Sequence, residues 1–147
     1  MKAAVIGAGA WGTALAIQLC KNGHETALWF RDPEKARAAG ESRCNPRLKN
    51  VPLPEALLLT ADAQCVRGCK IVVIAAPSFP IRSVCKTVSP FLDKDTVMVS
   101  VTKGIEPGTL LRMSQIVAQE TGHPVVALSG PCHAEEVAIQ MPTGCLA

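Results

Sequence analysis

Three glycines near the amino terminus, in the pattern Gly7-x-Gly9-x-x-Gly12, constrain the fold of this chain more than any other feature. They follow a short apolar run at residues 2–6 and precede a helical pattern at residues 11–21. Strand, glycine loop, helix and second strand fit within about 30 residues, the size of a nucleotide-binding βαβ unit. We therefore predict a parallel strand pair with a phosphate-binding loop between strand and helix.

Each glycine has a different structural role in such a loop. Gly7 permits the tight turn off the strand, Gly9 lets a pyrophosphate approach the backbone, and Gly12 lets the helix pack against the strand. Unpaired N–H groups and the positive end of the helix dipole meet at the helix start. The loop therefore predicts that a dinucleotide binds there.

Strand and helix patterns alternate along the rest of the chain. Further strands are expected at residues 25–30, 57–60, 71–75, 96–101 and 125–129, with helices starting near residue 32 and spanning 61–69, 79–88 and 109–119. The polar stretch 40–54, with three prolines, is expected to be a loop. Because parallel neighbours need crossover connections, this order predicts an α/β fold. We expect a doubly wound, mostly parallel, Rossmann-like sheet with helices on both faces, and one dinucleotide-binding domain over residues 1–147.

The composition limits which binding partners and which cellular compartment are expected for this chain. The net charge is +3 and the basic residues are scattered, so neither nucleic acid nor an acidic membrane surface is an expected partner. The longest apolar run, residues 71–76, is too short to span a membrane, and no secretory signal precedes the glycine loop. The seven cysteines have no C-x-x-C spacing, which favours reduced thiols in a cytoplasmic protein without a metal site.

The residues after the second strand bear on the choice between NAD and NADP. An acidic residue about 20 positions beyond the glycines would bond the ribose 2′-hydroxyl of NAD, and Asp32 has that spacing. The strand tip is nearer to Arg31, whose guanidinium could pair with a 2′-phosphate, and Asp32 could instead cap the next helix. Arg31 favours NADP(H), with NAD(H) tolerated; a merely solvated Arg31 is the alternative.

Three further loops are expected at the same edge of the sheet. Pro77-Ser78, Lys103-Gly104 and Ser129-Gly130-Pro131-Cys132 each follow a predicted strand. Ligands of doubly wound sheets bind at the carboxyl ends of the strands. Lys103 is therefore placed to meet an anion or to polarise a carbonyl group.

Taken together, these residues resemble a known family. The stretches that carry the resemblance are Gly7-Ala-Gly-Ala-Trp-Gly-Thr-Ala-Leu-Ala16, Leu28-Trp-x-Arg-Asp32, Pro77-Ser78, Lys103-Gly-Ile-Glu106, Leu128-Ser-Gly-Pro131, Ala134-x-Glu-Val137 and Pro142-Thr143. They are similar, from end to end, to the soluble, bacterial-type NAD(P)-dependent glycerol-3-phosphate dehydrogenases. The resemblance implies reversible hydride transfer between NAD(P)H and dihydroxyacetone phosphate, a phosphorylated ketone, giving sn-glycerol 3-phosphate for phospholipid synthesis.

The resemblance also implies roles for individual residues. Cofactor contacts are expected from Gly7, Gly9, Ala10, Trp11, Gly12, Arg31, Pro77, Lys103 and Ala134, and substrate contacts from Lys103, Gly130 and Cys132. Two positions depart from the family pattern. Cys132 replaces a Ser or Thr and exchanges a good hydrogen-bonding hydroxyl for a weak thiol, and Leu48 replaces an aromatic residue in the loop near Asn45.

In the family, a helical C-terminal domain carries the general acid/base lysine and the groups that hold the substrate phosphate. This chain ends before that domain, so no catalytic residue is expected within it. We expect the isolated chain to bind the dinucleotide and to turn over substrate negligibly, because hydride transfer needs the substrate held against the nicotinamide. A homo-oligomer is consistent with this, since an apolar face left by the missing domain would favour self-association.

Two other functions stay open on the sequence. One is the nucleotide domain of a different two-domain NAD(P) reductase, and the other is a non-catalytic NAD(P)-binding module. Several chemistry-bearing residues are given no role: His24 and His123 are interpreted as turn residues, and Glu135-Glu136 as a solvated pair. Adjacent Cys132 and His133 are not expected to form a thiolate–imidazole pair.

Overall fold

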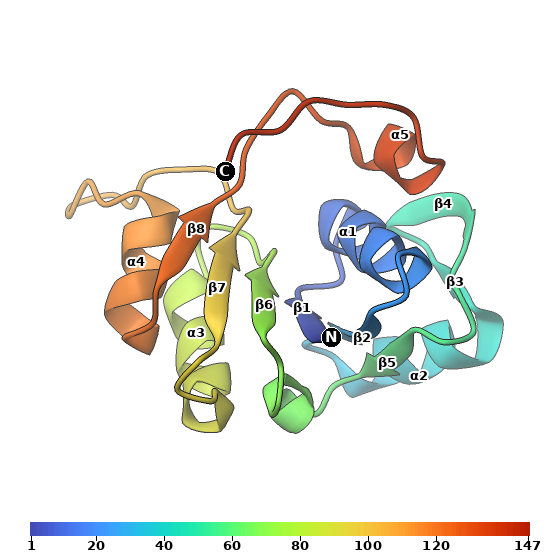
Figure 1. The fold of residues 1–147 in the computed structure, drawn as a ribbon, viewed down its shortest axis with the longest axis horizontal. Coiled ribbons are helices and arrows are strands. Elements are labelled where there is room, and N and C mark those ends of the chain that lie inside the picture. Colours follow the sequence, from blue (N-terminus) through green and yellow to red (C-terminus); the bar gives the residue numbers. More distant parts are fainter.

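Six parallel strands form the central sheet of the computed structural model, which describes residues 1–147 (Figure 1). Their spatial order is β5 (Leu58–Thr60), β2 (Glu25–Trp29), β1 (Lys2–Ile6), β6 (Ile71–Ile74), β7 (Val97–Ser100) and β8 (Val125–Ala127). The chain moves outward from β1 in one direction and, after β5, crosses back to β6 on its other side. The predicted Rossmann-like α/β fold is confirmed, and the point of reversal between β1 and β6 is where such sheets place their ligands.

Helices cover both faces of the sheet because successive strand residues point to opposite sides. In β1, Ala4 and Ile6 belong to one core cluster and Val5 to the other. The first cluster also takes buried residues from α3 (Ile81–Val88), α4 (Met113–Thr121) and the short helix η1 (Ala63–Val66). The second takes them from α1 (Ala10–Lys21), α2 (Pro33–Ser42) and α5 (Ala134–Ala138).

The prediction of a loop over residues 40–54 is wrong in part. Helix α2 continues to Ser42, and the left-handed Arg43, with φ 49°, ends it. An antiparallel pair follows, formed by β3 (Cys44–Asn45) and β4 (Leu48–Pro52). The reason is burial: Leu48 is 1% exposed and belongs to the core cluster under α1, where it anchors a segment that is otherwise polar.

Other helix boundaries also differ from expectation. Helix α4 begins at Met113 rather than at residue 109, because Leu110 has a left-handed φ of 58° and Ile105 pairs with Arg112 in an antiparallel bridge. The helix expected at residues 61–69 is only the 3-10 turn η1, and a second 3-10 turn, η2 (Ser89–Phe91), follows α3.

The end of the chain returns to the carboxyl edge of the sheet. After β8 the chain crosses to α5, which packs on α1, and then comes back to the tip of β8 (Figure 1). There Ser129 and Leu146 exchange two backbone hydrogen bonds, with N···O distances of 3.0 and 2.8 Å.

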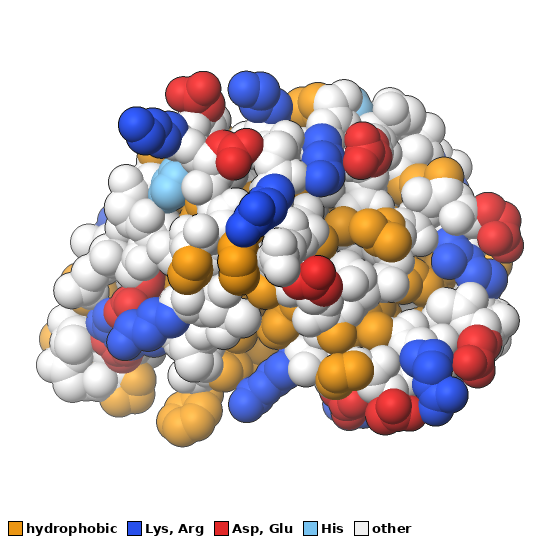
Figure 2. Space-filling view, turned by 90° about the horizontal axis from the view of Figure 1, so that it is seen from below, with side chains coloured by type: hydrophobic (Ala, Val, Ile, Leu, Met, Phe, Trp, Pro, Cys, Tyr) orange, Lys and Arg blue, Asp and Glu red, His pale blue; other side chains and the backbone are white.

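The molecular surface carries charges of both signs. On the face in Figure 2, Lys and Arg side chains alternate with Asp and Glu side chains, and apolar side chains lie between them. None of the helices combines the length and the apolar character that a membrane crossing requires.

Candidate functional site

The start of helix α1 presents backbone N–H groups that the helix itself does not use. The first helical hydrogen bond runs from the Thr13 N–H to the Gly9 carbonyl oxygen, with an N···O distance of 2.9 Å. The amides of residues 10–12 precede that bond and have no acceptor in the helix. No acidic residue lies in the first turn, and the capping position is Gly9, which has no side chain. This arrangement provides N–H donors and a positive dipole end for an anion.

The three glycines of the loop have different surroundings. A Cβ atom on Gly12 would lie 2.0 Å from the Gly7 carbonyl oxygen, and one on Gly7, where φ is 120°, would lie 2.8 Å from the Ala75 carbonyl carbon. A Cβ atom on Gly9 would meet nothing within 4 Å. The outer two positions therefore hold the loop tightly against β1 and the end of β6, whereas the middle one leaves open space beside the helix start.

A buried asparagine, to which the sequence analysis assigned no role, fixes this loop from the side. The side-chain amide of Asn45 donates to the Ala8 carbonyl oxygen at 3.1 Å and to the Thr13 hydroxyl at 2.7 Å. Asn45 lies in β3, so the β3–β4 pair supports the glycine loop directly. Asn45 belongs to no recognisable sequence motif, so its contact with Ala8 becomes evident only in the folded structure.

Two of the predicted edge loops contact each other across the sheet. The Thr102 hydroxyl, just beyond β7, donates to the Ala76 carbonyl oxygen just beyond β6, at 2.7 Å. A Cβ atom on Gly104, where φ is 130°, would lie 3.4 Å from the Ser78 Cβ. The loops that carry Pro77 and Lys103 are thereby adjacent, with Pro77 exposed at the rim.

Five of the predicted contact residues surround one pocket of about 250 Å³ at this edge. They are Trp11, Lys103, Gly130, Cys132 and Ala134. Trp11 comes from the first turn of α1 and Ala134 from the start of α5, so the pocket adjoins the free amides of the helix start. The other predicted residues lie outside it: Gly7, Gly9, Ala10 and Gly12 form the glycine loop, Pro77 follows β6, and Arg31 follows β2.

Lys103 is the cationic side chain of the pocket. Its ammonium nitrogen lies 3.3 Å from the Gly130 carbonyl oxygen, which links the loop after β7 to the loop after β8. Lys103 also borders a second, more open hollow of about 280 Å³ that Arg112 lines. The side chain is exposed and forms no ion pair shorter than 4.0 Å, so its charge is available to a ligand.

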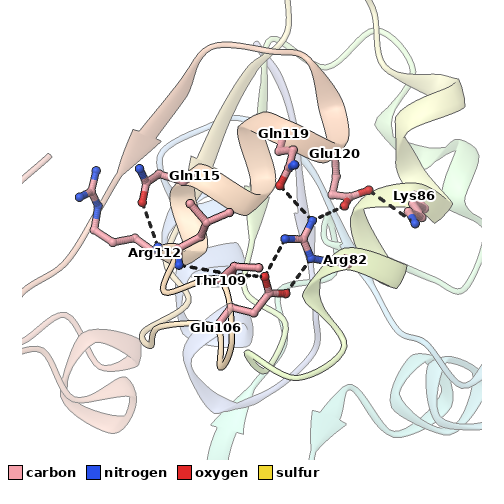
Figure 3. A network of polar contacts seen from close by, with 9 residues as sticks. Arg82, Lys86, Glu106, Thr109, Arg112, Gln115, Gln119 and Glu120 are labelled. Atoms are coloured by element: carbon pink, nitrogen blue, oxygen red, sulfur yellow. Dashed lines mark hydrogen bonds and ion pairs between the residues drawn. The ribbon is translucent and has the colours of Figure 1, made fainter.

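A partly buried ion-pair network holds the far end of the Lys103 loop (Figure 3). The guanidinium of Arg82, on α3, donates from two nitrogens to the two carboxylate oxygens of Glu106, both at 2.7 Å. A third nitrogen donates at 2.5 Å to Glu120 on α4, and Thr109 donates to Glu106 at 2.5 Å. Because of the hydrogen bonds from Arg82 and Thr109, the pKa of Glu106 is lowered to about 2. The segment beyond Lys103 is therefore tied to two helices.

Arg31 and Asp32 have clearly different environments. The Asp32 carboxylate accepts from the Glu34 N–H at 3.0 Å and caps helix α2, and it also lies 3.6 Å from the Lys35 ammonium nitrogen. Arg31 is exposed and has no hydrogen-bond partner in the chain. Of the two side chains, the guanidinium is the one left free for a ligand.

Cys132 interacts with sulfur and backbone rather than with its neighbour in sequence. Its Sγ lies 3.2 Å from the Gly144 carbonyl oxygen and 3.2 Å from the Sγ of Cys145. No hydrogen bond joins it to His133, whose backbone instead caps α5. No group of three or more His, Cys, Asp or Glu side chains is placed to hold a metal ion.

The doubly wound sheet, the glycine loop at its switch point and the pocket beside that loop define a Rossmann-like nucleotide-binding class of domain. Comparison with known proteins specifies the family. The family model for the N-terminus of NAD-dependent glycerol-3-phosphate dehydrogenase matches residues 2–147. The chain therefore belongs to this family.

Individual relatives agree with that assignment. The chain is 42% identical over 147 residues to the NAD(P)+ glycerol-3-phosphate dehydrogenase of Thermoanaerobacter sp. (strain X514), matching 99% of this chain and 44% of that protein. It is 47% identical over 145 residues to that of Geobacillus kaustophilus (strain HTA426), matching 95% and 42%. The crystal structure of the Coxiella burnetii glycerol-3-phosphate dehydrogenase superposes with a TM-score of 0.89 at 34% identity, over 98% of this chain and 45% of that one. The chain thus spans less than half the length of these relatives.

Proposed function

We propose that this chain is the NAD(P)-binding part of an oxidoreductase that transfers a hydride between NAD(P)H and dihydroxyacetone phosphate, giving sn-glycerol 3-phosphate. The observation that carries the proposal is the continuity between the start of α1 and the pocket: Trp11 belongs to both. A dinucleotide whose pyrophosphate meets the α1 amides has its nicotinamide end directed to that pocket. The relatives are named as NAD(P)+ glycerol-3-phosphate dehydrogenases, and this name supports both the substrate and the cofactor.

The residues present fit a dinucleotide. Gly9 leaves the space that a pyrophosphate needs, and the amides of Ala10 and Trp11 are donors beside it. Pro77 and Ala134 would border the cofactor, and Gly130 and Cys132 the substrate. The bound nicotinamide would supply or accept the hydride.

Lys103 would act on the substrate electrostatically. Its ammonium group, at the pocket and without an ion pair, would stabilise negative charge developing on the ketone oxygen. Lys103 is the only Lys or Arg side chain that lines this pocket, so we assign it the stabilisation of charge and not the whole of catalysis. We therefore expect NAD(P) binding by these 147 residues with negligible turnover of dihydroxyacetone phosphate.

Arg31 would decide the nucleotide preference. Its guanidinium is free, whereas Asp32 already caps α2. A charge-assisted bond from Arg31 to the 2′-phosphate of NADP(H) would favour this cofactor, with NAD(H) still accepted.

The test is a fluorescence titration of the chain with NADPH and with NADH. NADPH should bind more tightly, and Arg31→Ala should weaken NADPH binding by about tenfold or more while leaving NADH nearly unchanged. Arg67→Ala is the matched control, since Arg67 follows η1 at the opposite edge of the sheet and should change neither affinity. Equal losses for both nucleotides would show that Arg31 does not meet the 2′-phosphate, and no binding of either would refute the proposal.

A second assay addresses the substrate. NADPH consumption with dihydroxyacetone phosphate should be negligible for the chain and measurable only when the remainder of the relatives' length is present. Preference of such a longer protein for a hydroxyacid would favour a different two-domain reductase. We expect the protein to act in the cytoplasm, where NAD(P)H is available. Light scattering would report whether the chain self-associates.

A further inference from the structure

Two cysteines that are 13 positions apart in the sequence have their sulfur atoms in contact at the wall of the pocket. The Sγ atoms of Cys132 and Cys145 are 3.2 Å apart, and both residues line the pocket. Both are free thiols, Cys132 half-buried and Cys145 exposed. A covalent S–S bond is about 2.05 Å long, so the sulfurs need to approach by little more than one ångström.

The fold brings these two cysteines together through their backbones. The segments that carry them are joined by the two hydrogen bonds between Ser129 and Leu146. Gly130 allows the close approach, since a Cβ atom there would lie 2.5 Å from the Gly144 carbonyl oxygen and 3.2 Å from the Cys145 Cα. The sulfur contact is therefore part of a packed crossing of two backbone segments, which the Ser129–Leu146 bridge holds together.

The electrostatic surroundings distinguish these thiols from the others. Hydrogen bonds from Thr143 and Cys145, together with the Lys103 charge, lower the pKa of Cys132. The hydrogen bond to Cys132 raises the pKa of Cys145, so Cys132 is the more acidic of the two thiols. A lower pKa increases the fraction of thiolate, which is the nucleophilic form of cysteine, and the adjacent Cys145 thiol is within reach to complete a disulfide.

Three of the remaining cysteines are protected by burial. Burial raises the pKa of Cys65 to about 12, of Cys69 to about 11 and of Cys85 to about 12. Thiols of this kind are inert at neutral pH. Cys20 and Cys44 have no second sulfur beside them within hydrogen-bonding distance.

We infer that Cys132 and Cys145 form a reversible intramolecular disulfide when the protein meets a hydroperoxide. The Cys132 thiolate attacks one oxygen of the hydroperoxide and the O–O bond breaks, giving a sulfenic acid. The other oxygen leaves as an alkoxide, or as hydroxide when the oxidant is hydrogen peroxide. The Cys145 thiol then attacks the sulfenic sulfur, the S–O bond breaks, and water leaves with the thiol proton. The two sulfurs give one electron each and the peroxide takes both, and a dithiol reductant reverses the change.

The disulfide would act on the pocket that the proposed function uses, although its formation depends on no nucleotide. It would fix the segment of Gly130, whose carbonyl oxygen accepts from Lys103, to the segment of Cys145. One pocket wall would lose its freedom to move. Oxidation of the two cysteines would thereby alter the surroundings of Lys103, the side chain that we assign to substrate binding.

The experiment is a thiol count on the native chain before and after hydrogen peroxide. The number of reactive thiols in denaturant should fall from seven to five, and a dithiol should restore all seven. Cleavage at Glu135 or Glu136, which lie between the two cysteines, should leave the two fragments joined until reduction. Fragments that separate after peroxide treatment would overturn the inference, as would a disulfide that links other cysteines.

Variants make the assignment specific. Cys145→Ser and Cys132→Ser should each abolish the linkage, and circular dichroism should confirm that each is folded. Cys44→Ser is the matched control, because it removes an exposed thiol elsewhere and should leave the linkage intact. Two independent single variants keep the test decisive even if one of them does not fold. Since no step requires NAD(P), failure of the cofactor titration leaves this result unaffected.

Discussion

The side-chain amide of Asn45 donates a 2.7 Å hydrogen bond to the hydroxyl of Thr13, and both residues are almost fully buried. The same amide group holds the Ala8 carbonyl oxygen of the glycine loop. One side chain therefore connects the β3–β4 pair, the first turns of α1 and the phosphate-binding loop. Support of this kind from behind a site determines how exactly the site keeps its shape.

Replacing Asn45 with alanine should lower both stability and nucleotide affinity. The change leaves the buried Thr13 hydroxyl and the partly buried Ala8 carbonyl oxygen without their partner, which costs about 1–3 kcal/mol. Urea unfolding measures the loss of stability, and NADPH titration measures the affinity. Lys49→Ala, an exposed change on β4, is the control and should alter neither. A fully stable Asn45→Ala chain would contradict the supporting role.

Alanine substitutions at two glycines of the loop should affect folding stability and nucleotide binding differently. Gly12→Ala places a Cβ atom 2.0 Å from a backbone oxygen, which no side-chain movement relieves, so it should destabilise the fold by about 3 kcal/mol or more. Gly9→Ala meets open space and should change the free energy of unfolding by less than about 1 kcal/mol. It should nevertheless weaken NADPH binding, because the methyl group occupies the approach to the amides. Unfolding curves and titrations of the two variants, side by side, check the contrast.

We expect Asp32 to cap helix α2 and to contribute nothing to NADPH affinity. Asp32→Ala removes the acceptor for the Glu34 N–H and should cost about 1 kcal/mol of stability. NADPH affinity should stay the same. A selective loss of NADH affinity in this variant would show instead that the Asp32 carboxylate reaches the ribose and that the chain is built for NAD.

The Arg82–Glu106 pair should make stability depend on pH in the acid range. The folded-state pKa of Glu106 lies at about 2, below the value of about 4.3 for an unfolded chain, so the carboxylate contributes stability above that unfolded value. This contribution is lost as the pH falls toward the folded pKa. Urea unfolding between about pH 5 and pH 2 should show a smaller decline in Arg82→Gln than in the wild type. Lys94→Gln, an exposed lysine change, should leave the decline as it is.

The strands of this fold could be predicted from the sequence because the residue patterns that indicate them are local. Residues 2–6 are followed by glycines, and residues 71–74 are β-branched and uncharged, so β1 and β6 are found at their expected places. The β3–β4 pair was missed, since Pro46, Pro52 and the surrounding polar residues resemble a loop. Its one strong anchor, Leu48, is a single apolar residue whose burial depends on α1.

The site was predictable in its residue types but not in its connections. The edge loops pointed to Lys103, and the family resemblance added Trp11, Gly130, Cys132 and Ala134; the fold brings all five to one pocket. Asn45 and Cys145 gave no signal, because their partners are 32 and 13 positions away. The start of α4 was placed too early, because a distant arginine on α3 holds Glu106 in a non-helical segment.

The position of β1 has a consequence for how the chain is made. Strand β1, which is synthesised before β2 and β6, pairs on one side with β2, at Lys2 and Glu25, but on the other side with β6, at Ala3 and Ile71. Until some seventy residues have been synthesised, one hydrogen-bonding edge of that strand has no native neighbour. The nascent chain must therefore shield this edge for several seconds at ordinary translation rates of about 5–20 residues per second. The glycine loop, in which Gly7 lies against the end of β6, can take its final form only after β6 has been synthesised.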